Sequence, residues 1–347
     1  MEPLYIKQYD YLVFIGRFNP LHDGHIEVIT KALKMAEHVI VLVGSANQPS
    51  TIKNPFSFDE RKKMLLGSVE SDALSVLPLR DFKYDNNVWA ANVQRVVAGE
   101  VTRLYGWTDK PLRGGIIGHE KDASSFYLKL FPQWDLIDHP LNEDVSATDI
   151  RKLYFEKNIK FIQQVVPQYV YGFLESYKTT QAYKTLVQEY EYIEKYKQSW
   201  AVAPYAPTFL TADALVVQSG HVLLVKRRAY PGKGLWALPG GFVNQSERIE
   251  DAMLRELKEE TNIKLPVPVL RGSIKESKIF DAPDRSLRGR TVTQTFLIEL
   301  PAGDLISVRG GDDAVNAKWV PISFIREEEL FEDHYGMITY FLGQLVQ

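Results

Sequence analysis

The first half of the chain alternates continuous apolar runs with stretches whose apolar residues recur at helical spacing. Residues 11–15 and 39–43 are runs of the kind found in strands buried on both faces, whereas residues 26–36 have the spacing of an amphipathic helix. The same patterns predict further elements, namely strands at 75–79, 116–118 and 135–137 and helices starting near residue 59 and over 88–97. Strands that alternate with helices favour a parallel sheet with right-handed crossovers and helices on both faces. Ligands of such sheets lie beyond the carboxyl ends of the strands.

The pattern changes after a tyrosine-rich amphipathic stretch that extends from residue 183 to near Trp200. Residues 201–207 contain two prolines within four positions, which break a helix and favour extended backbone. Beyond them, two apolar runs flank Ser219-Gly220, a pattern typical of a hairpin. We therefore expect three segments: a domain over 1–180, a helical linker over 181–207 and a second domain over 208–347.

Composition and charge exclude several classes of protein. The chain has 347 residues, enough for two domains, and its net charge of −3 gives no basic footprint, so we expect no nucleic-acid partner. It contains no cysteine, which excludes disulfides, thiolate metal sites and cysteine nucleophiles. No apolar run approaches the roughly 20 residues that span a bilayer, and Met1 is not followed by a signal-peptide pattern. We therefore expect a cytoplasmic protein without a membrane partner, and the tyrosine-rich linker leaves a homo-oligomer as an open alternative.

The segment between the first strand and the first helix carries two histidines. Residues 16–25 read Gly-Arg-Phe-Asn-Pro-Leu-His-Asp-Gly-His. The free N–H groups and the dipole of a helix N-terminus favour a phosphate at this point, and His22 and His25 add side-chain donors. The segment strongly resembles the H-x-G-H signature of nucleotidyltransferases, which transfer a nucleoside monophosphate from an NTP to an acceptor. The structural alternative is that one histidine caps the helix and the other lies in the core.

A second segment that precedes a helix has a similar character. Ser146 or Thr148 can cap the helix and donate hydroxyl hydrogen bonds, and Arg151 can present a planar fork of donors to a phosphate. Residues 145–151 resemble the S-x-T-x-x-R element that accompanies H-x-G-H in adenylyltransferases. The resemblance implies that Arg151 and the two histidines are the catalytic residues, stabilising charge on the phosphates of ATP with Mg²⁺ bridging phosphate oxygens. The alternative is a capping serine beside a surface arginine.

Further residues indicate the acceptor of the transferred group. Residues 16–25, 85–89 and 117–122 resemble nicotinamide mononucleotide (NMN) adenylyltransferases of the archaeal type, which make NAD⁺ and pyrophosphate from NMN and ATP. Because a tryptophan face suits a flat cation, we expect Trp89 to support the nicotinamide ring and either Asn87 or backbone groups to contact its carboxamide. The other expected substrate-binding residues of this domain are Gly16, Arg17 (for the ATP triphosphate), Phe18, Gly118, Ser146 and Thr148. Open alternatives are a core role for the tryptophan and another acceptor: nicotinic acid mononucleotide, FMN, phosphopantetheine or a choline-type phosphate.

The strongest single match lies in the second half of the chain. Gly241 is followed by five residues and Glu247, and then by seven residues and the run 255–263. This pattern resembles the Nudix box, G-x5-E-x7-R-E-U-x-E-E-x-G-U with U apolar, except that Asn262 replaces the last glycine. Asparagine tolerates the left-handed backbone that ends such a helix better than other non-glycine residues do. The two resemblances imply an α/β protein, with a Rossmann-like nucleotidyltransferase domain followed by an α/β/α Nudix domain with a mixed sheet.

The spacing of three glutamates in the box is typical of a metal site. Glu256, Glu259 and Glu260 share one helical face, where like charges are unfavourable unless a cation lies among them, and carboxylate ligands favour Mg²⁺ or Mn²⁺. The resemblance implies that Glu256, Glu260 and the carbonyl group of Gly240 bind the metal. Glu259 would be a further ligand or would hold the attacking water, so that Glu259 and Glu260 are the expected catalytic residues. The alternative is a solvated acidic helix.

Substrate choice in the second domain depends on residues outside the box. The loop over 280–290 resembles a loop of ADP-ribose-handling members of the family, which implies that Arg285 and Arg290 hold the diphosphate or the terminal ribose. The alternative is an exposed charged loop. Asp312 and Asp313 are weaker candidates for a further metal ligand.

Together the two resemblances cover nearly the whole chain. In this combination the chain resembles the bifunctional NMN adenylyltransferase/Nudix hydrolases of bacteria. The resemblances imply that ATP, NMN and ADP-ribose are the small-molecule substrates, and that ADP-ribose is hydrolysed to AMP and ribose 5-phosphate. Two alternatives for the second domain are another nucleoside diphosphate derivative as substrate and a non-catalytic ADP-ribose sensor. A sensor would be expected to have a degraded box and a basic DNA-binding module, whereas all three box glutamates are present.

Overall fold

The computed structural model describes residues 7–108, 110–119, 123–139, 146–311 and 314–343. The chain divides into two compact units, residues 1–187 (the first unit) and 188–347 (the second unit). In the described residues, no helix is both long and apolar enough to cross a membrane. Asp312 and Asp313, and residues 120–122 of the expected substrate-binding string, lie outside the described residues.

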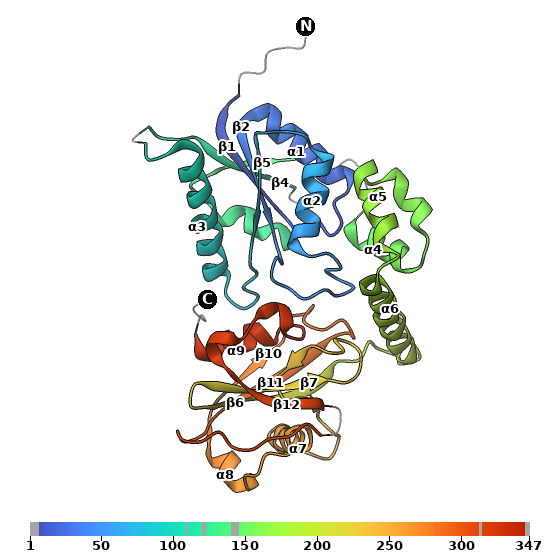
Figure 1. Ribbon diagram of the computed structural model, residues 1–347, viewed down its shortest axis with the longest axis vertical. Helices are drawn as coiled ribbons and strands as arrows, with labels where there is room; N and C mark the ends of the chain where they lie inside the picture. Colours follow the sequence, from blue (N-terminus) through green and yellow to red (C-terminus); the bar gives the residue numbers. More distant parts are fainter. Residues whose placement is uncertain (1–6, 109, 120–122, 140–145, 312–313, 344–347) are drawn as a thin grey trace. The chain divides into compact units, whose positions relative to one another are not determined.

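A parallel sheet forms the centre of the first unit (Figure 1). Its strands, in the spatial order β3-β2-β1-β4-β5, are β1 (Tyr9–Gly16), β2 (Ala36–Val43), β3 (Leu74–Pro78), β4 (Gly114–Gly118) and β5 (Asp135–Asp138). Each neighbouring pair is parallel, because the connections between them are helical crossovers. The parallel sheet expected from the alternating pattern is confirmed. Its carboxyl edge carries Gly16, Val43 and Gly118.

Helices cover both faces of this sheet (Figure 1). Val13, Ile40 and Ile116 pack with Val93 and Val97 in one buried cluster, so α3 lies on that face, while α1 and α2 lie on the other. The helices of the first unit are α1 (Asp23–Met35), α2 (Phe58–Ser68), α3 (Asn86–Tyr105), α4 (Ala147–Phe155) and α5 (Gln168–Tyr177), with 3₁₀ segments η1 (Ala123–Leu130) and η2 (Ile159–Gln164). The Rossmann-like arrangement is therefore confirmed.

The tyrosine-rich stretch forms α6 (Gln181–Ser199), and the division between the two units falls within this helix. In the first unit, the hydroxyl group of Tyr183 donates a hydrogen bond to the carbonyl oxygen of Tyr154 at 2.9 Å. Residues 188–199 of the helix belong to the second unit.

A mixed sheet forms the centre of the second unit, with β10-β11-β6-β7-β12 as its main path. Its strands are β6 (Phe209–Gln218), β7 (His221–Arg227), β8 (Trp236–Ala237), β9 (Gly240–Phe242), β10 (Ile274–Phe280), β11 (Thr291–Glu299) and β12 (Ala314–Pro321). β11 and β6 are parallel, whereas β6 and β7 form an antiparallel hairpin. Ser219 and Gly220 both adopt positive φ at its turn, at 45° and 72°, so the hairpin predicted there is confirmed.

Helices cover this sheet on both faces as well. Met253 and Leu257 of α7 pack against Ala214 and Ile298 of the sheet, whereas Met337 of α9 contacts the opposite face, where its sulfur accepts a hydrogen bond from a threonine hydroxyl group of β11. The helices are α7 (Ile249–Thr261), α8 (Val267–Gly272) and α9 (His334–Leu342), with 3₁₀ segments η3 (Ile322–Phe324) and η4 (Glu327–Glu329). The expected α/β/α arrangement with a mixed sheet is confirmed.

Asn262 ends α7 in the left-handed conformation, with φ 49° and ψ 29°. Its Nδ2 also donates a hydrogen bond to the carbonyl oxygen of Arg309 at 3.0 Å. We expect Asn262→Ala to lower the free energy of unfolding of the second unit by about 1–2 kcal/mol, because alanine adds backbone strain and loses the hydrogen bond. Asn262→Gly, which loses only the side-chain bond, is the control in a urea titration. Equal unfolding midpoints for the two variants would contradict this account.

Candidate functional site

The first candidate site lies at the carboxyl edge of the parallel sheet, where the chain passes from β1 to α1. Gly16 ends β1, and the chain then turns through Arg17 and Phe18. Phe18 adopts a positive φ of 50°, and its buried ring packs against His25, with a centroid distance of 4.8 Å. His22 then occupies the N-cap position of α1. The sequence therefore folds so that both histidines and the free N–H groups of a helix start meet at one place.

The two histidines form a neutral pair whose rings are in contact and tilted by 36°. Their ring centroids lie 3.7 Å apart, and Nδ1 of His25 accepts a hydrogen bond from the backbone N–H of His22 at 3.2 Å. Burial lowers the pKa of His22 to about 4, and burial followed by the neighbouring His22 lowers the pKa of His25 well below its usual value. Since Nδ1 of His25 is an acceptor, the proton of the neutral ring is on Nε2. The ring thus offers an N–H donor at its far end.

Arg151 reaches the same turn from α4. Ser146 caps that helix by accepting a hydrogen bond from the N–H of Asp149, while Arg151 Nη2 donates to Thr148 Oγ1 at 3.1 Å. Its Nη1 donates to the carbonyl oxygen of Asn19 at 2.8 Å. Burial, followed by the charge of Arg17, lowers the pKa of Arg151 to about 10, so it stays protonated at neutral pH. Arg151, and with it Thr148, is therefore brought to the histidine turn, whereas Ser146 caps α4.

The sequence interpretation missed a third guanidinium group here. Arg61 of α2 is 1% exposed, and its Nη1 donates to the carbonyl oxygens of Arg17 at 2.8 Å and Gly44 at 2.7 Å. The charge of Arg17 is among the causes that lower the pKa of Arg61 and of Arg151, so Arg17 repels both of the other cations. The available signal is that Arg61 shares a helical face with buried Met64 and Leu65. Such a cluster favours a polyanion.

The residues expected at the nicotinamide ring are less closely gathered. Trp89 is partly buried and packs on the apolar cluster under α3, 5.9 Å from Tyr127 and 6.0 Å from Phe131 between ring centroids. Asn87 is exposed in the first turn of α3, where its backbone N–H donates to the N-cap side chain of Asp85. Gly118 lies buried at the carboxyl end of β4. Trp89 thus has a packing role besides any contact with a ligand.

The second candidate site is a cavity of about 260 Å³ in the second unit. Gly240 and Gly241 of β9 form part of its wall, together with Glu256 and Glu260 of α7. Arg255 also lines this cavity, whereas Glu259 is not among its lining residues. The described structure therefore places Gly241, Arg255, Glu256 and Glu260 of the box at one concave surface, whereas Glu247 and Glu259 do not line it.

Glu260 has a strongly raised pKa in this cavity. Its Oε2 accepts a hydrogen bond from the N–H of Gly240 at 2.9 Å, and burial, with Glu256 as a smaller cause, raises the pKa of Glu260 to about 8. A Cβ atom at Gly241 would lie 2.5 Å from Oε1 of Glu256, so only glycine lets this carboxylate approach β9. Two carboxylates beside the backbone of β9 form an all-oxygen donor set that suits a hard divalent cation.

Arg255 partly compensates the negative charge on and beside the acidic face of α7. Its guanidinium group donates to Glu247 at 2.7 Å, to Glu256 at 2.7 Å and to Glu259 at 3.0 Å. Hydrogen bonds from Arg255 lower the pKa of Glu247 to about 2. In the part of the chain that the structure describes, no three acidic or histidine side chains converge on one point. Glu256 and Glu260 approach β9, while Glu259 faces Arg255 with 45% of its side chain exposed.

The arginines of the loop over 280–290 have different surroundings. Arg285 is buried and makes a bidentate ion pair with Asp333, with both bonds at 2.9 Å. Arg290 pairs with Asp281 and does not line the cavity, whereas Arg288 does, and its guanidinium group lies 5.0 Å from the ring centroid of Phe242. Sequence reasoning did not select Arg288 because the resemblance gave no means to rank three arginines of one loop.

Arg227 and Asp213 are two further residues that the sequence interpretation missed. Both line the cavity, and burial lowers the pKa of Arg227 and raises the pKa of Asp213 to about 6. The hydroxyl group of Thr293 donates a hydrogen bond to Asp213. Asp213 lies in the middle of β6 and Arg227 is the last residue of β7, so neither belongs to the box and no motif signals them.

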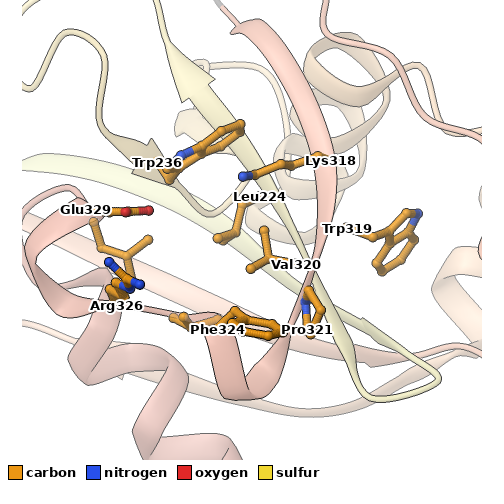
Figure 2. Close-up of a pocket in the computed structure, with 11 residues that line it drawn as sticks. Leu224, Trp236, Lys318, Trp319, Val320, Pro321, Phe324, Arg326 and Glu329 are labelled. Atoms are coloured by element: carbon orange, nitrogen blue, oxygen red, sulfur yellow. The ribbon is translucent and has the colours of Figure 1, made fainter. Parts of the chain in front are cut away.

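A separate cavity of about 200 Å³ lies in the same unit between β12 and the segment that follows it (Figure 2). The ammonium group of Lys318 lies 4.1 Å from the ring centroid of Trp236. Glu329 supplies the only carboxylate among the residues that line it. This cavity therefore has no acidic pair of the kind seen beside Gly240.

Known proteins are similar to each of the two parts of the chain. Residues 13–153 match the "Cytidylyltransferase-like" family model, and residues 207–341 match the "NUDIX domain" model. A nicotinamide/nicotinic acid mononucleotide adenylyltransferase of Acinetobacter baylyi is 36% identical over 186 residues, which cover 53% of this chain and 94% of the relative. An ADP-ribose pyrophosphatase of Methanocaldococcus jannaschii is 33% identical over 138 residues, 40% of this chain and 75% of the relative.

One solved structure matches almost the whole chain. It is a bifunctional NMN adenylyltransferase/ADP ribose pyrophosphatase from Francisella tularensis, in complex with AMP and a manganese ion. The TM-score is 0.87 at 36% sequence identity, and the match covers 96% of this chain and 98% of that one. The likeness therefore extends through both units.

Proposed function

This chain belongs to the family of bifunctional NMN adenylyltransferase/ADP-ribose pyrophosphatases, and on that premise we propose that it catalyses two reactions. The first unit transfers AMP from ATP to NMN, giving NAD⁺ and pyrophosphate. The second unit hydrolyses ADP-ribose to AMP and ribose 5-phosphate with Mg²⁺ or Mn²⁺. The observation that carries the proposal is that each unit gathers the charge its reaction needs: guanidinium groups at a helix start, and paired carboxylates beside a glycine strand.

In the adenylyl transfer, a phosphate oxygen of NMN forms a bond to the α-phosphorus of ATP while the bond to the leaving pyrophosphate breaks. Because the nucleophile is already an anion, the reaction needs alignment and charge stabilisation rather than a general base. Arg17 and Arg151 would hold the polyphosphate, and the Nε2–H of His25 would donate to an oxygen whose charge grows in the transition state. Arg61 acts through its bonds to the carbonyl groups of the turn, so its proposed role is to position Arg17.

In the hydrolysis, Glu256, Glu260 and the carbonyl group of Gly240 would hold the divalent cation, with Glu259 as a further candidate. When bound, that cation would polarise the pyrophosphate and favour ionisation of the attacking water. Arg255 would orient Glu256. Arg227 and Arg288, rather than Arg290, are positioned in the cavity to contact the anionic substrate.

Product analysis tests the proposal directly. The purified protein is incubated with Mg²⁺ or Mn²⁺ and, separately, ADP-ribose, NAD⁺, NADH or a diadenosine polyphosphate, and the products are identified by chromatography. Formation of AMP and ribose 5-phosphate from ADP-ribose alone is expected. In parallel, NMN, nicotinic acid mononucleotide, FMN and phosphopantetheine are compared as acceptors with ATP. Nicotinic acid mononucleotide is the second candidate acceptor, because the Acinetobacter relative is named for both nucleotides.

The neutral histidine pair predicts the pH dependence of adenylyl transfer. Because the pKa of His22 is lowered to about 4 and that of His25 is also lowered, neither ring loses a required proton as the pH rises from 6 to 8. We expect kcat/KM for NMN to rise with the second ionisation of its phosphate, near pH 6 by analogy with phosphoserine, and then to stay level. Initial rates between pH 5 and 8.5 measure this. A decline between pH 6.5 and 8 would indicate an essential imidazolium group instead.

A further inference from the structure

The second half of α6, residues 188–199, belongs to the second unit, yet the matched Nudix model begins only at residue 207. Of this half-helix, Glu189 is 5% exposed. Burying a carboxylate costs free energy unless hydrogen bonds compensate for the lost water. Burial raises the pKa of Glu189, so the contacts that hold this side chain inside the unit are informative.

The first contact of the half-helix is with the loop between β7 and β8. Oε1 of Glu189 accepts a hydrogen bond from the backbone N–H of Gly232 at 2.7 Å. Beside it, the hydroxyl group of Tyr230 donates to Oε1 of Gln188 at 3.1 Å, and the rings of Tyr192 and Tyr230 lie 6.2 Å apart between centroids. Three side chains of the helix therefore hold residues 230–232 of this loop.

The same loop forms one wall of the hydrolytic cavity. Arg228 and Ala229 line the cavity, and so does Arg227, whose Nε donates to the carbonyl oxygen of Pro231 at 2.9 Å. Gly232, the residue held by Glu189, has a positive φ of 72° and no room for a Cβ atom, which would lie 2.2 Å from the ring of Phe331. A shift of Gly232 would therefore be transmitted to Pro231 and to the guanidinium group of Arg227.

The second contact of the half-helix is with aromatic rings that lead to another group of cavity-lining residues. Tyr196 of the helix and Trp200, just after it, pack on Phe209, with centroid distances of 5.7 Å and 5.3 Å. Phe209 packs in turn on Phe242, 5.9 Å away, and the guanidinium group of Arg288 lies over Phe242. Phe242 and Arg288 both line the cavity. The helix thus supports two separate groups of cavity residues.

We propose that residues 188–200 are a positioning element of the hydrolytic site, and that Glu189 is the positioning residue that sets the β7–β8 loop and with it Arg227 for the anionic substrate. This inference rests on the proposed hydrolase function. It makes the half-helix part of the hydrolase rather than a spacer. Because Glu189 acts on substrate contacts and not on the carboxylates of α7, its loss is expected to change binding more than turnover.

Kinetics of the full-length protein test the split between binding and turnover. Glu189→Ala is expected to raise KM for ADP-ribose about tenfold with kcat changed less than about threefold, because the positioned loop binds substrate. Glu189→Gln keeps an oxygen acceptor for the N–H of Gly232 and is expected to restore KM to within about twofold. Glu194→Ala, an exposed glutamate of the same helix that pairs with Lys197, is the matched control. Adenylyl transfer should be unchanged in all three variants.

Tyr230→Phe provides a milder variant that removes only the hydroxyl group bonded to Gln188. It is expected to raise KM about twofold in the same direction. Loss of kcat at constant KM in Glu189→Ala, or failure of Glu189→Gln to restore KM, would overturn the positioning role.

Limited trypsin digestion separates this inference from the proposed function. The loop contains Arg228 and Lys233, both exposed, and Glu189→Ala is expected to speed cleavage after either residue several-fold over the wild type and Glu194→Ala. If the wild type does not hydrolyse ADP-ribose, the proposed function fails, while faster cleavage still supports a loop held by Glu189. Unchanged cleavage, or faster cleavage with an unchanged KM in an active hydrolase, would overturn the inference.

Discussion

Glu260→Gln is expected to reduce the turnover number for ADP-ribose hydrolysis by at least about a thousandfold while leaving adenylyl transfer unchanged. The carboxylate of Glu260 is buried beside Gly240 and Glu256, and its raised pKa, about 8, reflects the cost of keeping it charged without a cation. Glutamine has nearly the same shape but no charge to attract a divalent ion. Initial rates of AMP release at saturating Mg²⁺ or Mn²⁺ measure the effect.

Glu250→Gln is the control for this variant. Glu250 lies in the first turn of the same helix, is partly exposed and pairs with Arg271, so its loss should change hydrolysis by less than about twofold. The adenylyl transfer rate of each preparation reports whether the first unit is intact. If Glu260→Gln hydrolysed ADP-ribose as fast as the wild type, the carboxylate pair would not be the metal site.

His25→Ala is expected to lower the turnover number for adenylyl transfer by about a hundred- to a thousandfold, with KM for NMN changed only a few-fold. The reason is that the Nε2–H of the neutral ring donates to a phosphate oxygen whose negative charge increases only in the transition state. Interactions of this kind change kcat more than binding. Steady-state kinetics with NMN and ATP, followed by NAD⁺ formation, give both constants.

Two further variants make this prediction specific. His25→Gln retains an N–H donor at a similar distance from the backbone and is expected to recover part of the lost turnover. His221→Ala, on the hairpin of the second unit, should leave the reaction unchanged, since its ring contacts only the local carbonyl group of Ser219. Equal turnover of His25→Ala and the wild type would show that the helix start and the arginines are sufficient without this donor.

Local sequence signals predicted the elements that carry the two sites. The continuous apolar run before Gly16, the capping serine at 146 and the left-handed tolerance of Asn262 each depend on neighbours in the chain, so a pattern could identify them. The resemblance of residues 241–263 to the Nudix box also identified Glu256 and Glu260, which line the cavity. The apolar run, the helix cap and the left-handed residue follow from periodicity and backbone preference.

Tertiary packing decided the rest of the sites. In the sequence Arg61 is an ordinary arginine of a helix. In the structure its guanidinium group donates hydrogen bonds to three carbonyl oxygens in the turns that follow β1 and β2. Arg285 lines the cavity, but only the structure shows that its guanidinium group is held in a buried ion pair with Asp333, and that Arg288 lines the same cavity. The burial of Glu189 against the β7–β8 loop joins residues 43 positions apart. Partners so distant in sequence leave no periodic signal.

The hydrogen bonds of Arg255 to Glu247, Glu256 and Glu259 affect how α7 tolerates its own negative charge. Several carboxylates on one helix face repel one another when no cation lies among them. Here the guanidinium group of Arg255 lies among them and reduces this repulsion. At the proposed metal site, this guanidinium group would help to keep α7 folded in the absence of the metal ion, and an arriving ion would compete with it for the carboxylates. Lysine could not serve in the same way, because its single ammonium group lacks the planar fork that reaches three acids at once.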